Sequence, residues 1–318
     1  MNTIFNKIHN YFIVCGYILL SLFIHCSLGA TINASHEDKS IVVVVPSYNN
    51  IQWLERNLGS ILMQKHSNFR VIYINDKSRD KTGEMVEEYV RQRGIDYRAV
   101  TFEEKSENSI LDNLHDFIQL VNQETHFFTL VNNAKRCGAL ENLYRGIHSC
   151  HNRDIVATVD GDDFLFDDEA LKRINDAYAS DKVWLTHGCL IEYPHGHVSW
   201  SEPIPPHIIK ANAFRTFKCP SHCRTFYAGL FKKIQLPHLL YEGKLFPMAW
   251  DMAMMYPMAE MAGERHAYLS QVNYVYNMAN QLNDNKVNPD LQNYLDRLIR
   301  GMPRYERLPD DFNITLEE

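Results

Sequence analysis

The 318-residue chain is predicted to be an α/β protein whose doubly wound, mostly parallel sheet carries helices on both faces. Three observations support this fold class: apolar runs that do not alternate with polar residues, helical stripes that follow these runs, and polar or acidic clusters where the runs end. Open sheets of this kind bind ligands beyond the carboxyl ends of their strands. A functional site is therefore expected where the polar clusters meet.

The first strand is predicted over Ile41 to Val45, and the polar loop Pro46 to Asn50 follows it. A helix is expected next, with Asn50 as its N-cap. Its apolar residues recur at helical spacing: Trp53, Leu54, Leu58, Ile61 and Leu62.

A second strand is predicted over Phe69 to Ile74 and ends in the polar cluster Asn75 to Thr82. Apolar residues between Met85 and Val90 then mark another helix. The segment from Phe102 to Gln123 carries one further helical stripe, and we interpret it as an insertion between strands that packs against the sheet. A lid that binds an acceptor is the alternative.

The most informative run is Ile155 to Asp163, an apolar strand that ends in Asp160, Gly161, Asp162 and Asp163. Carboxylates this close repel one another unless a cation lies between them, so the run predicts a divalent metal site. Oxygen ligands suit Mg²⁺ or Mn²⁺. An EF-hand is excluded because Phe164 and Phe166 stand where that motif needs oxygen ligands.

Four motifs, each at a predicted strand end or loop, make the chain similar to the family 2 glycosyltransferases of the GT-A fold. They are Val44 to Asn49, Ile74 to Thr82, Arg136 to Asn142, and Val159 to Asp163. Order and spacing agree over Ile41 to Tyr193 and more weakly to Val287. The resemblance implies transfer of a sugar from a nucleotide-diphosphate donor, a UDP-sugar, to an acceptor hydroxyl, with a divalent metal and inversion at the anomeric carbon.

The resemblance also implies which residues act. Asp76 contacts the uracil ring, Asp160 faces the ribose, and Asp162 binds the metal with Asp160 beside it. Asn75 and Lys77 depart from the acidic residue and the glycine common in the family. The donor-binding residues implied by the match are Pro46, Ser47, Tyr48, Asn49, Asp76, Arg136, Asp160 and Gly161.

An inverting transfer needs a carboxylate that takes the proton of the acceptor hydroxyl. Asp251 opens an apolar, Met-rich helix at the place where the family carries this base, so we predict that Asp251 is catalytic. The helix amino terminus would keep Asp251 ionised, and Trp250 could stack on a sugar. A simple N-cap is the alternative role for Asp251.

The loop from Ser221 to Phe226 contains His222 and Arg224, which we predict to contact the diphosphate or to complete the metal shell. A surface loop that pairs with nearby acids is the alternative. A zinc site at Cys219, His222 and Cys223 is not expected, because no second ligand pair follows.

Two rival functions were considered. A nucleotidyltransferase of similar sheet architecture would need a Gly-rich basic loop after the first strand, which Pro46 to Asn50 lacks. An inactive carbohydrate-binding module would not need Asp160, Asp162 and Asp251. The formal net charge of -7 argues against nucleic acid as a partner.

Residues 1–40 are predicted to form a signal-anchor or a signal peptide with a short linker, because Tyr11 to Ala30 is almost wholly apolar. Lys7 before this segment favours a single-pass anchor with a lumenal catalytic part in the Golgi or endoplasmic reticulum; secretion or a bacterial envelope are the alternatives. Residues 41–193 are expected to bind the nucleotide sugar. Residues 194–318 are expected to form the acceptor side, for a glycan, lipid or protein acceptor, and the carboxyl-terminal tail.

Overall fold

The computed structural model describes residues 38–105, 110–180, 182–198 and 201–314, and the chain from Asp38 onward forms one compact unit. The predicted signal-anchor or signal peptide lies outside the described residues, except for the end of its linker. Within the described ranges, none of the helices has the length and apolar character needed to cross a bilayer. Membrane attachment therefore stays a prediction from sequence.

The main sheet has the strand order β3-β4-β2-β1-β5-β9-β7-β12-β6, and β8 pairs with β7. The five strands from β3 to β5 are parallel, β9 runs antiparallel between β5 and β7, and β12 is parallel to β7. The main strands are β1 (Ile41–Ser47), β2 (Phe69–Asn75), β3 (Tyr97–Phe102), β4 (Phe128–Asn133), β5 (Ile155–Thr158), β7 (Leu185–Tyr193), β9 (Arg224–Tyr227) and β12 (His266–Asn277). The short strands are β6 (Phe164–Leu165), β8 (His197–Val198) and the separate pair β10 (Leu240–Tyr241) and β11 (Lys244–Leu245).

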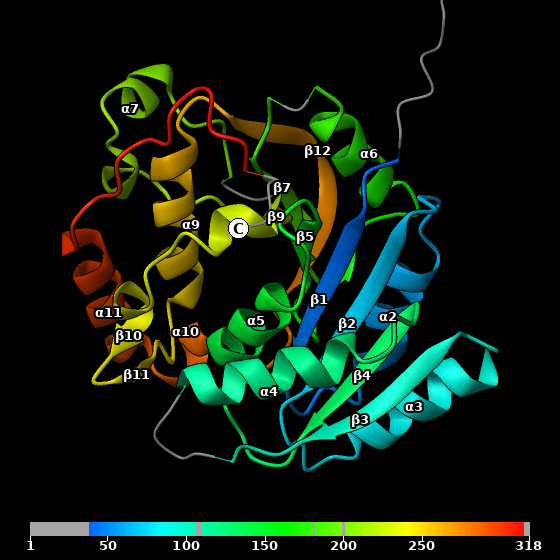
Figure 1. Ribbon diagram of the computed structural model, residues 1–318. Coiled ribbons are helices and arrows are strands. Elements are labelled where there is room, and N and C mark those ends of the chain that lie inside the picture. Colours follow the sequence, from blue (N-terminus) through cyan, green and yellow to red (C-terminus); the bar gives the residue numbers. More distant parts are fainter. Residues whose placement is uncertain (1–37, 106–109, 181, 199–200, 315–318) are drawn as a thin grey trace, which may run out of the picture. The chain divides into compact units, whose positions relative to one another are not determined.

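Helices cover both faces of the sheet, as predicted. Figure 1 shows α4 (Ile110–Asn122) and α5 (Ala139–His148) on one face, with α2 (Leu54–Leu62) and α3 (Thr82–Gln92) on the other. The remaining helices are α6 (Ala170–Tyr178), α7 (Pro206–Lys210), α8 (Ala228–Phe231), α9 (Trp250–Ala262), α10 (Asp284–Val287) and α11 (Pro289–Gly301), with 3₁₀ turns at Phe214–Thr216 and Leu236–Leu239. The sequence correctly predicted a mixed, mostly parallel α/β sheet.

Two local predictions were wrong. Asn50 does not cap α2, which begins at Leu54 after Trp53; the Asn50 side chain instead donates to Ser47 Oγ. The segment from Phe102 to Gln123 is not an insertion, because β3 and α4 form a regular crossover to β4. The strand β3 went unrecognised because it lies at the sheet edge, where most of its side chains are only partly buried and its apolar pattern is weak.

The Met-rich helix α9 lies in the core, as its sequence indicated. Every residue from Met252 to Ala262 is buried, although this stretch contains Pro257 and the charged residue Glu260. Glu260 receives two hydrogen bonds from Arg215, at 2.6 Å from Nε and 2.9 Å from a terminal nitrogen. Arg215 also donates to the carbonyl of Ile299 at 2.6 Å. This buried pair joins α9 to α11 and to the 3₁₀ turn that contains Arg215.

Removal of Arg215 is expected to destabilise the fold strongly. Arg215→Met leaves the carboxylate of Glu260 buried without its partner, which costs about 3–5 kcal/mol. Urea unfolding of Arg215→Met and of the double variant Arg215→Met/Glu260→Met measures this, and the double variant is expected to be the more stable of the two. Lys172→Met is the control, because its pair with Asp176 is exposed. A loss below about 1 kcal/mol for Arg215→Met would contradict the expectation.

Candidate active site

A cavity of about 700 Å³ lies at the carboxyl ends of β1, β2 and β5 and at the amino ends of α5 and α9. All but one of the residues predicted from sequence to bind donor or metal or to catalyse transfer line it: Pro46, Ser47, Tyr48, Asn49, Asp76, Arg136, Asp160, Asp162, His222, Arg224 and Asp251. The exception, Gly161, lies against the loop after β1. The structure thus brings the predicted residues together, and their individual roles stay predictions.

The loop after β1 is fixed by hydrogen bonds to its neighbours. Ser47 Oγ accepts from Tyr73 Oη at 2.8 Å and from Asn50 Nδ2 at 3.1 Å. Asn49 has a left-handed backbone conformation, with φ of 54°, and its side-chain oxygen accepts from the backbone of Arg79 at 2.7 Å. The loops after β1 and β2 therefore form one preorganised wall of the cavity.

Asp76 organises the loop before α5. Its carboxylate accepts from the backbone nitrogens of Cys137 and Gly138, each at 2.8 Å, and from Asn133 Nδ2 at 3.0 Å. Arg136, next to this loop contact, lies over the ring of Tyr48 with its guanidinium carbon 3.9 Å from the ring centre. The carboxylate of Asp76, which we predict to contact the uracil ring, therefore also holds the loop before α5 in its conformation.

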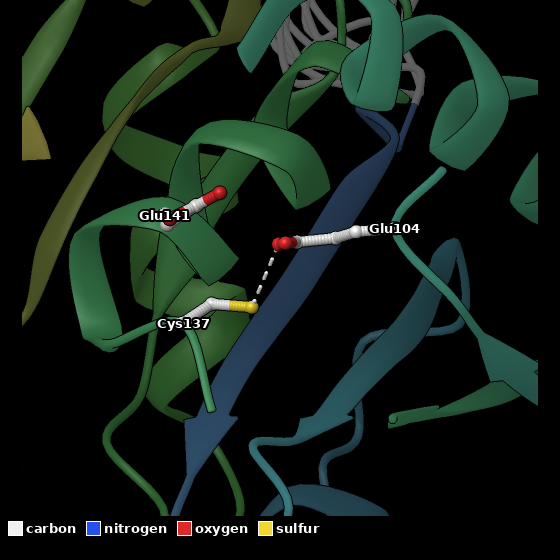
Figure 2. A group of neighbouring side chains, drawn as sticks. All are labelled: Glu104, Cys137 and Glu141. Atoms are coloured by element: carbon white, nitrogen blue, oxygen red, sulfur yellow. Dashed lines mark hydrogen bonds between the residues drawn. The ribbon is translucent and has the colours of Figure 1, made fainter. Parts of the chain in front are cut away.

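A cluster of Glu104, Cys137 and Glu141 fixes the other side of this loop (Figure 2). The fully buried guanidinium of Arg145 bonds Glu104 at 2.7 Å, Glu141, and the sulfur of Cys137 at 3.4 Å. Burial raises the pKa of Cys137 to about 12, so its thiol stays protonated and donates to Glu104. Since the guanidinium of Arg145 already pairs with both carboxylates, we interpret the cluster as an ion-pair network and not as a metal site.

The three carboxylates after β5 divide into two groups. Asp163 is buried, and its oxygens accept from the backbone of Asn277 at 2.7 Å and from Tyr274 Oη at 2.8 Å, so it anchors the end of β12. Asp160 and Asp162 line the cavity. Burial and the charge of Asp160 raise the pKa of Asp162 to about 6, and Asp162 Oδ2 accepts from Asn280 Nδ2 at 2.6 Å. The sequence showed the cluster but not this division.

His222 lies beside Asp160. It is only 7% exposed, its ring is parallel to that of Tyr274 at 4.5 Å, and no hydrogen bond reaches its Nε2. The nearest oxygen of Asp160 is 3.5 Å from this atom. Burial and the charge of Arg224 lower the pKa of His222, so the ring is neutral at neutral pH. Surface exposure, the alternative for this segment, is wrong, because β9 lies inside the sheet.

Asp251 lies in the first turn of α9, where its carboxylate accepts from Arg224 at 2.9 Å. The residue that precedes the helix is Ala249, so Asp251 is not the N-cap that we considered as its alternative role. Arg224 is 4% exposed, and its Nε is a buried donor without a hydrogen bond to any described residue. The Arg224 guanidinium therefore holds the Asp251 carboxylate in place at the cavity edge.

Sequence reasoning missed the asparagine-rich loop after β12. Asn277 Nδ2 donates to the carbonyl of Asp162 at 3.1 Å, and Asn280 contacts the Asp162 carboxylate. Asn283 and Asp284 continue this side of the cavity. The family match thins in this part of the chain, and only the repeated Asn and Asp residues between Asn277 and Asp284 could have indicated it.

Gly161→Ala is expected to weaken UDP binding about tenfold or more, because an added Cβ would lie 2.4 Å from Ser47 Oγ and push the loop after β1 out of position. Calorimetric titration with UDP and Mn²⁺ measures the change. Gly301→Ala is the matched control, since nothing lies within 4 Å of its added Cβ. Equal affinities of Gly161→Ala and Gly301→Ala would show that this close contact does not matter for the donor.

Comparison with known proteins agrees with this geometry. The family model for glycosyl transferase family 2 matches residues 42–110. An uncharacterized glycosyltransferase of Rickettsia bellii is 37% identical over 60 residues, which are 19% of this chain and 9% of that protein. Glycosyltransferase GlyA of Streptococcus pneumoniae is 33% identical over 69 residues, 22% of this chain and 10% of that protein. The matched segments thus span about a tenth of these relatives.

Solved structures show the same fold over most of the chain. TarS residues 1–349 of S. aureus superpose with a TM-score of 0.54 at 16% identity, covering 82% of this chain and 64% of that one. Glucosyl-3-phosphoglycerate synthase of Mycobacterium tuberculosis, in complex with Mn²⁺, UDP and glucosyl-3-phosphoglycerate, gives a TM-score of 0.50 at 13% identity and covers 85% and 83%. The chain therefore has the GT-A fold of these glycosyltransferases, and its residues 42–110 are similar to glycosyl transferase family 2.

Proposed function

We propose that the protein is a metal-dependent, inverting glycosyltransferase that moves a sugar from a UDP-sugar to an acceptor hydroxyl. The observation that carries this proposal is that Asp160, Asp162 and His222 line the same cavity as Asp251. Asp160, Asp162 and His222 have the chemistry to hold a metal beside a diphosphate, and Asp251 has the chemistry to take the proton of the acceptor hydroxyl.

The wall formed by the loops after β1 and β2 is the proposed site of the nucleoside. It contains Ser47, Tyr48 and Asp76, which the family resemblance assigns to the donor. Solved structures of the same fold support uridine: TarS of S. aureus has been solved with UDP, at a TM-score of 0.50 and 16% identity over 75% of this chain and 60% of that one. The synthase of M. tuberculosis also holds UDP.

Asp160, Asp162 and His222, which we call the metal wall, have side chains that fit a divalent cation such as Mn²⁺ or Mg²⁺. Buried His222 presents a neutral ring nitrogen that has no hydrogen bond, with a carboxylate oxygen of Asp160 at 3.5 Å. Burying a ring nitrogen that has no hydrogen bond is energetically unfavourable unless a bound ligand contacts that nitrogen. Asp160 and Asp162 would supply oxygen ligands, and His222 a nitrogen ligand. When bound, the metal neutralises the charge that develops on the departing diphosphate.

Asp251 is the proposed general base. It lies in the first turn of α9, and Arg224 fixes its orientation. From there Asp251 takes the proton of the acceptor hydroxyl as that oxygen attacks the anomeric carbon from the side opposite the diphosphate. Trp250, next to it in the cavity lining, offers an aromatic face to a sugar.

The remaining predictions belong to the same proposal. The acceptor is a glycan, lipid or protein, and residues 1–40 attach the enzyme to a membrane with the catalytic part in a lumen. The relatives described above are bacterial, which supports the bacterial envelope as the alternative location. The family match favours sugar transfer over the nucleotidyltransferase alternative.

A donor screen tests the proposed function. UDP-, GDP- and ADP-sugars are incubated with the protein, with and without Mn²⁺, and free nucleoside diphosphate is measured. Release of UDP that depends on Mn²⁺ is the expected result. Binding of the donors without any release, in the presence of varied acceptors, would favour the inactive carbohydrate-binding module instead.

A further inference from the structure

We propose that Asp284 is a specificity-determining residue that accepts a hydrogen bond from a hydroxyl group of the acceptor. The cavity lining around it also contacts an apolar part of that acceptor. The inference rests on the proposed function and extends it, because it states which part of the cavity receives the acceptor and which chemical class fits there. The class is an amphipathic glycoside, with sugar hydroxyls at one end and an apolar group at the other.

Asp284 is a carboxylate without a partner. It lines the cavity at the start of α10, and within the described part of the chain its side chain makes neither a hydrogen bond nor an ion pair. Burial, together with the charges of Asp251, Asp160 and Asp162, raises its pKa to about 6. A carboxylate in such a place is unfavourable for folding, and its retention is explained when a ligand completes its hydrogen bonds.

The position of Asp284 favours the acceptor over the nucleotide. The proposed nucleoside wall comes from the loops after β1 and β2, whereas Asp284 belongs to the carboxyl-terminal half of the chain, as Asp251 does. Asp251 and Asp284 line the same cavity, and the charge of Asp251 acts on Asp284. Since Asp251 must reach the reacting hydroxyl, a carboxylate near it is placed to hold another hydroxyl of the same molecule.

Apolar side chains lie on the same wall. Leu282 and Val287 line the cavity although their side chains are 45% and 58% exposed, and Trp250, Met248 and Leu291 line it as well. A nucleotide or a free sugar would leave Leu282 and Val287 largely in water. An acceptor with an alkyl or similar apolar group would cover them, and each buried CH₂ group strengthens binding by roughly fourfold.

The test uses octyl and methyl β-glycosides of glucose, galactose and mannose as probes. Their binding to the complex of the protein with UDP and Mn²⁺ is followed by saturation-transfer difference NMR and by calorimetry, and their turnover is followed with the donor found in the screen. At least one octyl glycoside is expected to bind, and to bind more tightly than its methyl counterpart. Asp284→Asn is expected to weaken that binding about tenfold to a hundredfold.

Four further measurements separate this role from others. In Asp284→Asn the affinity for UDP is expected to change less than about twofold, and Asp311→Asn, the same change at an exposed site, should leave glycoside binding as it is. A structural role would lower the melting temperature; we instead expect Asp284→Asn to raise it by about 2 °C at pH 7.5, where an unpaired carboxylate is ionised. Val287→Ser is expected to reduce the preference for octyl over methyl glycosides.

The inference is overturned if no glycoside binds to the complex with UDP and Mn²⁺, if Asp284→Asn binds glycosides as the wild type does, or if it loses affinity for UDP to the same extent. Failure of the proposed function has a different signature, because no donor would then be turned over, whether or not UDP and Mn²⁺ bind.

Discussion

Asp251→Asn is expected to reduce sugar transfer by about a thousandfold, within the range that a general base contributes, while UDP and Mn²⁺ should still bind. The amide is close in size to the carboxylate and can still contact Arg224, but it does not accept the proton of the acceptor hydroxyl. Transfer is measured as initial rate at saturating donor, and UDP affinity is measured by calorimetry on the same preparations. The expected signature is a fall in kcat without a matching loss of donor affinity.

Asp290→Asn is the control for this variant. Asp290 is the second residue of α11, as Asp251 is of α9, but it lies on the exposed surface outside the cavity lining. Any effect that arises only from a changed charge at a helix amino terminus would appear in both variants. Transfer by Asp251→Asn at more than about a tenth of the wild-type rate would remove Asp251 from its assigned role.

Asp162→Ala is expected to abolish the stimulation of transfer by Mn²⁺ and to lower turnover about a hundredfold or more. Asp162 is one of the two carboxylates of the proposed metal site, and both charges would help to hold the ion near the diphosphate. Binding of Mn²⁺ is followed by electron paramagnetic resonance, and is expected to weaken in parallel with activity. Asp167→Ala is the matched control, because this nearby carboxylate pairs with Arg173 and lies outside the cavity.

The raised pKa of Asp162 predicts how the affinity for Mn²⁺ depends on pH. Burial raises the pKa of Asp162 to about 6, so protons compete with Mn²⁺ below that value. Affinity for Mn²⁺ is expected to rise from pH 5 to pH 7 and then to level off. Asp162→Ala should flatten this part of the profile. Full metal stimulation in Asp162→Ala would show that the ion is held elsewhere.

The sequence by itself determined the first half of the site. Local patterns marked β1, β2 and β5 as apolar strands and placed Ser47, Asp76 and the carboxylates from Asp160 at their carboxyl ends. In parallel strands these ends meet at one edge of the sheet, so the loops had to converge without further information. The position of Asp251 at the start of α9 followed equally from a local pattern, one polar residue before an apolar helix.

Only the tertiary structure decided what each of these groups faces. Arg224 begins the central strand β9, and His222 lies just before it, because β9 inserts antiparallel between β5 and β7, a pairing between segments far apart in the chain. Another long-range contact brings β12 against the carboxylates that follow β5. As a result, Asp163 contacts Tyr274 and Asp162 lines the cavity. Burial, charge neighbours and free hydrogen-bonding atoms depend on such pairings and not on local spacing, so they emerge only when the chain is folded.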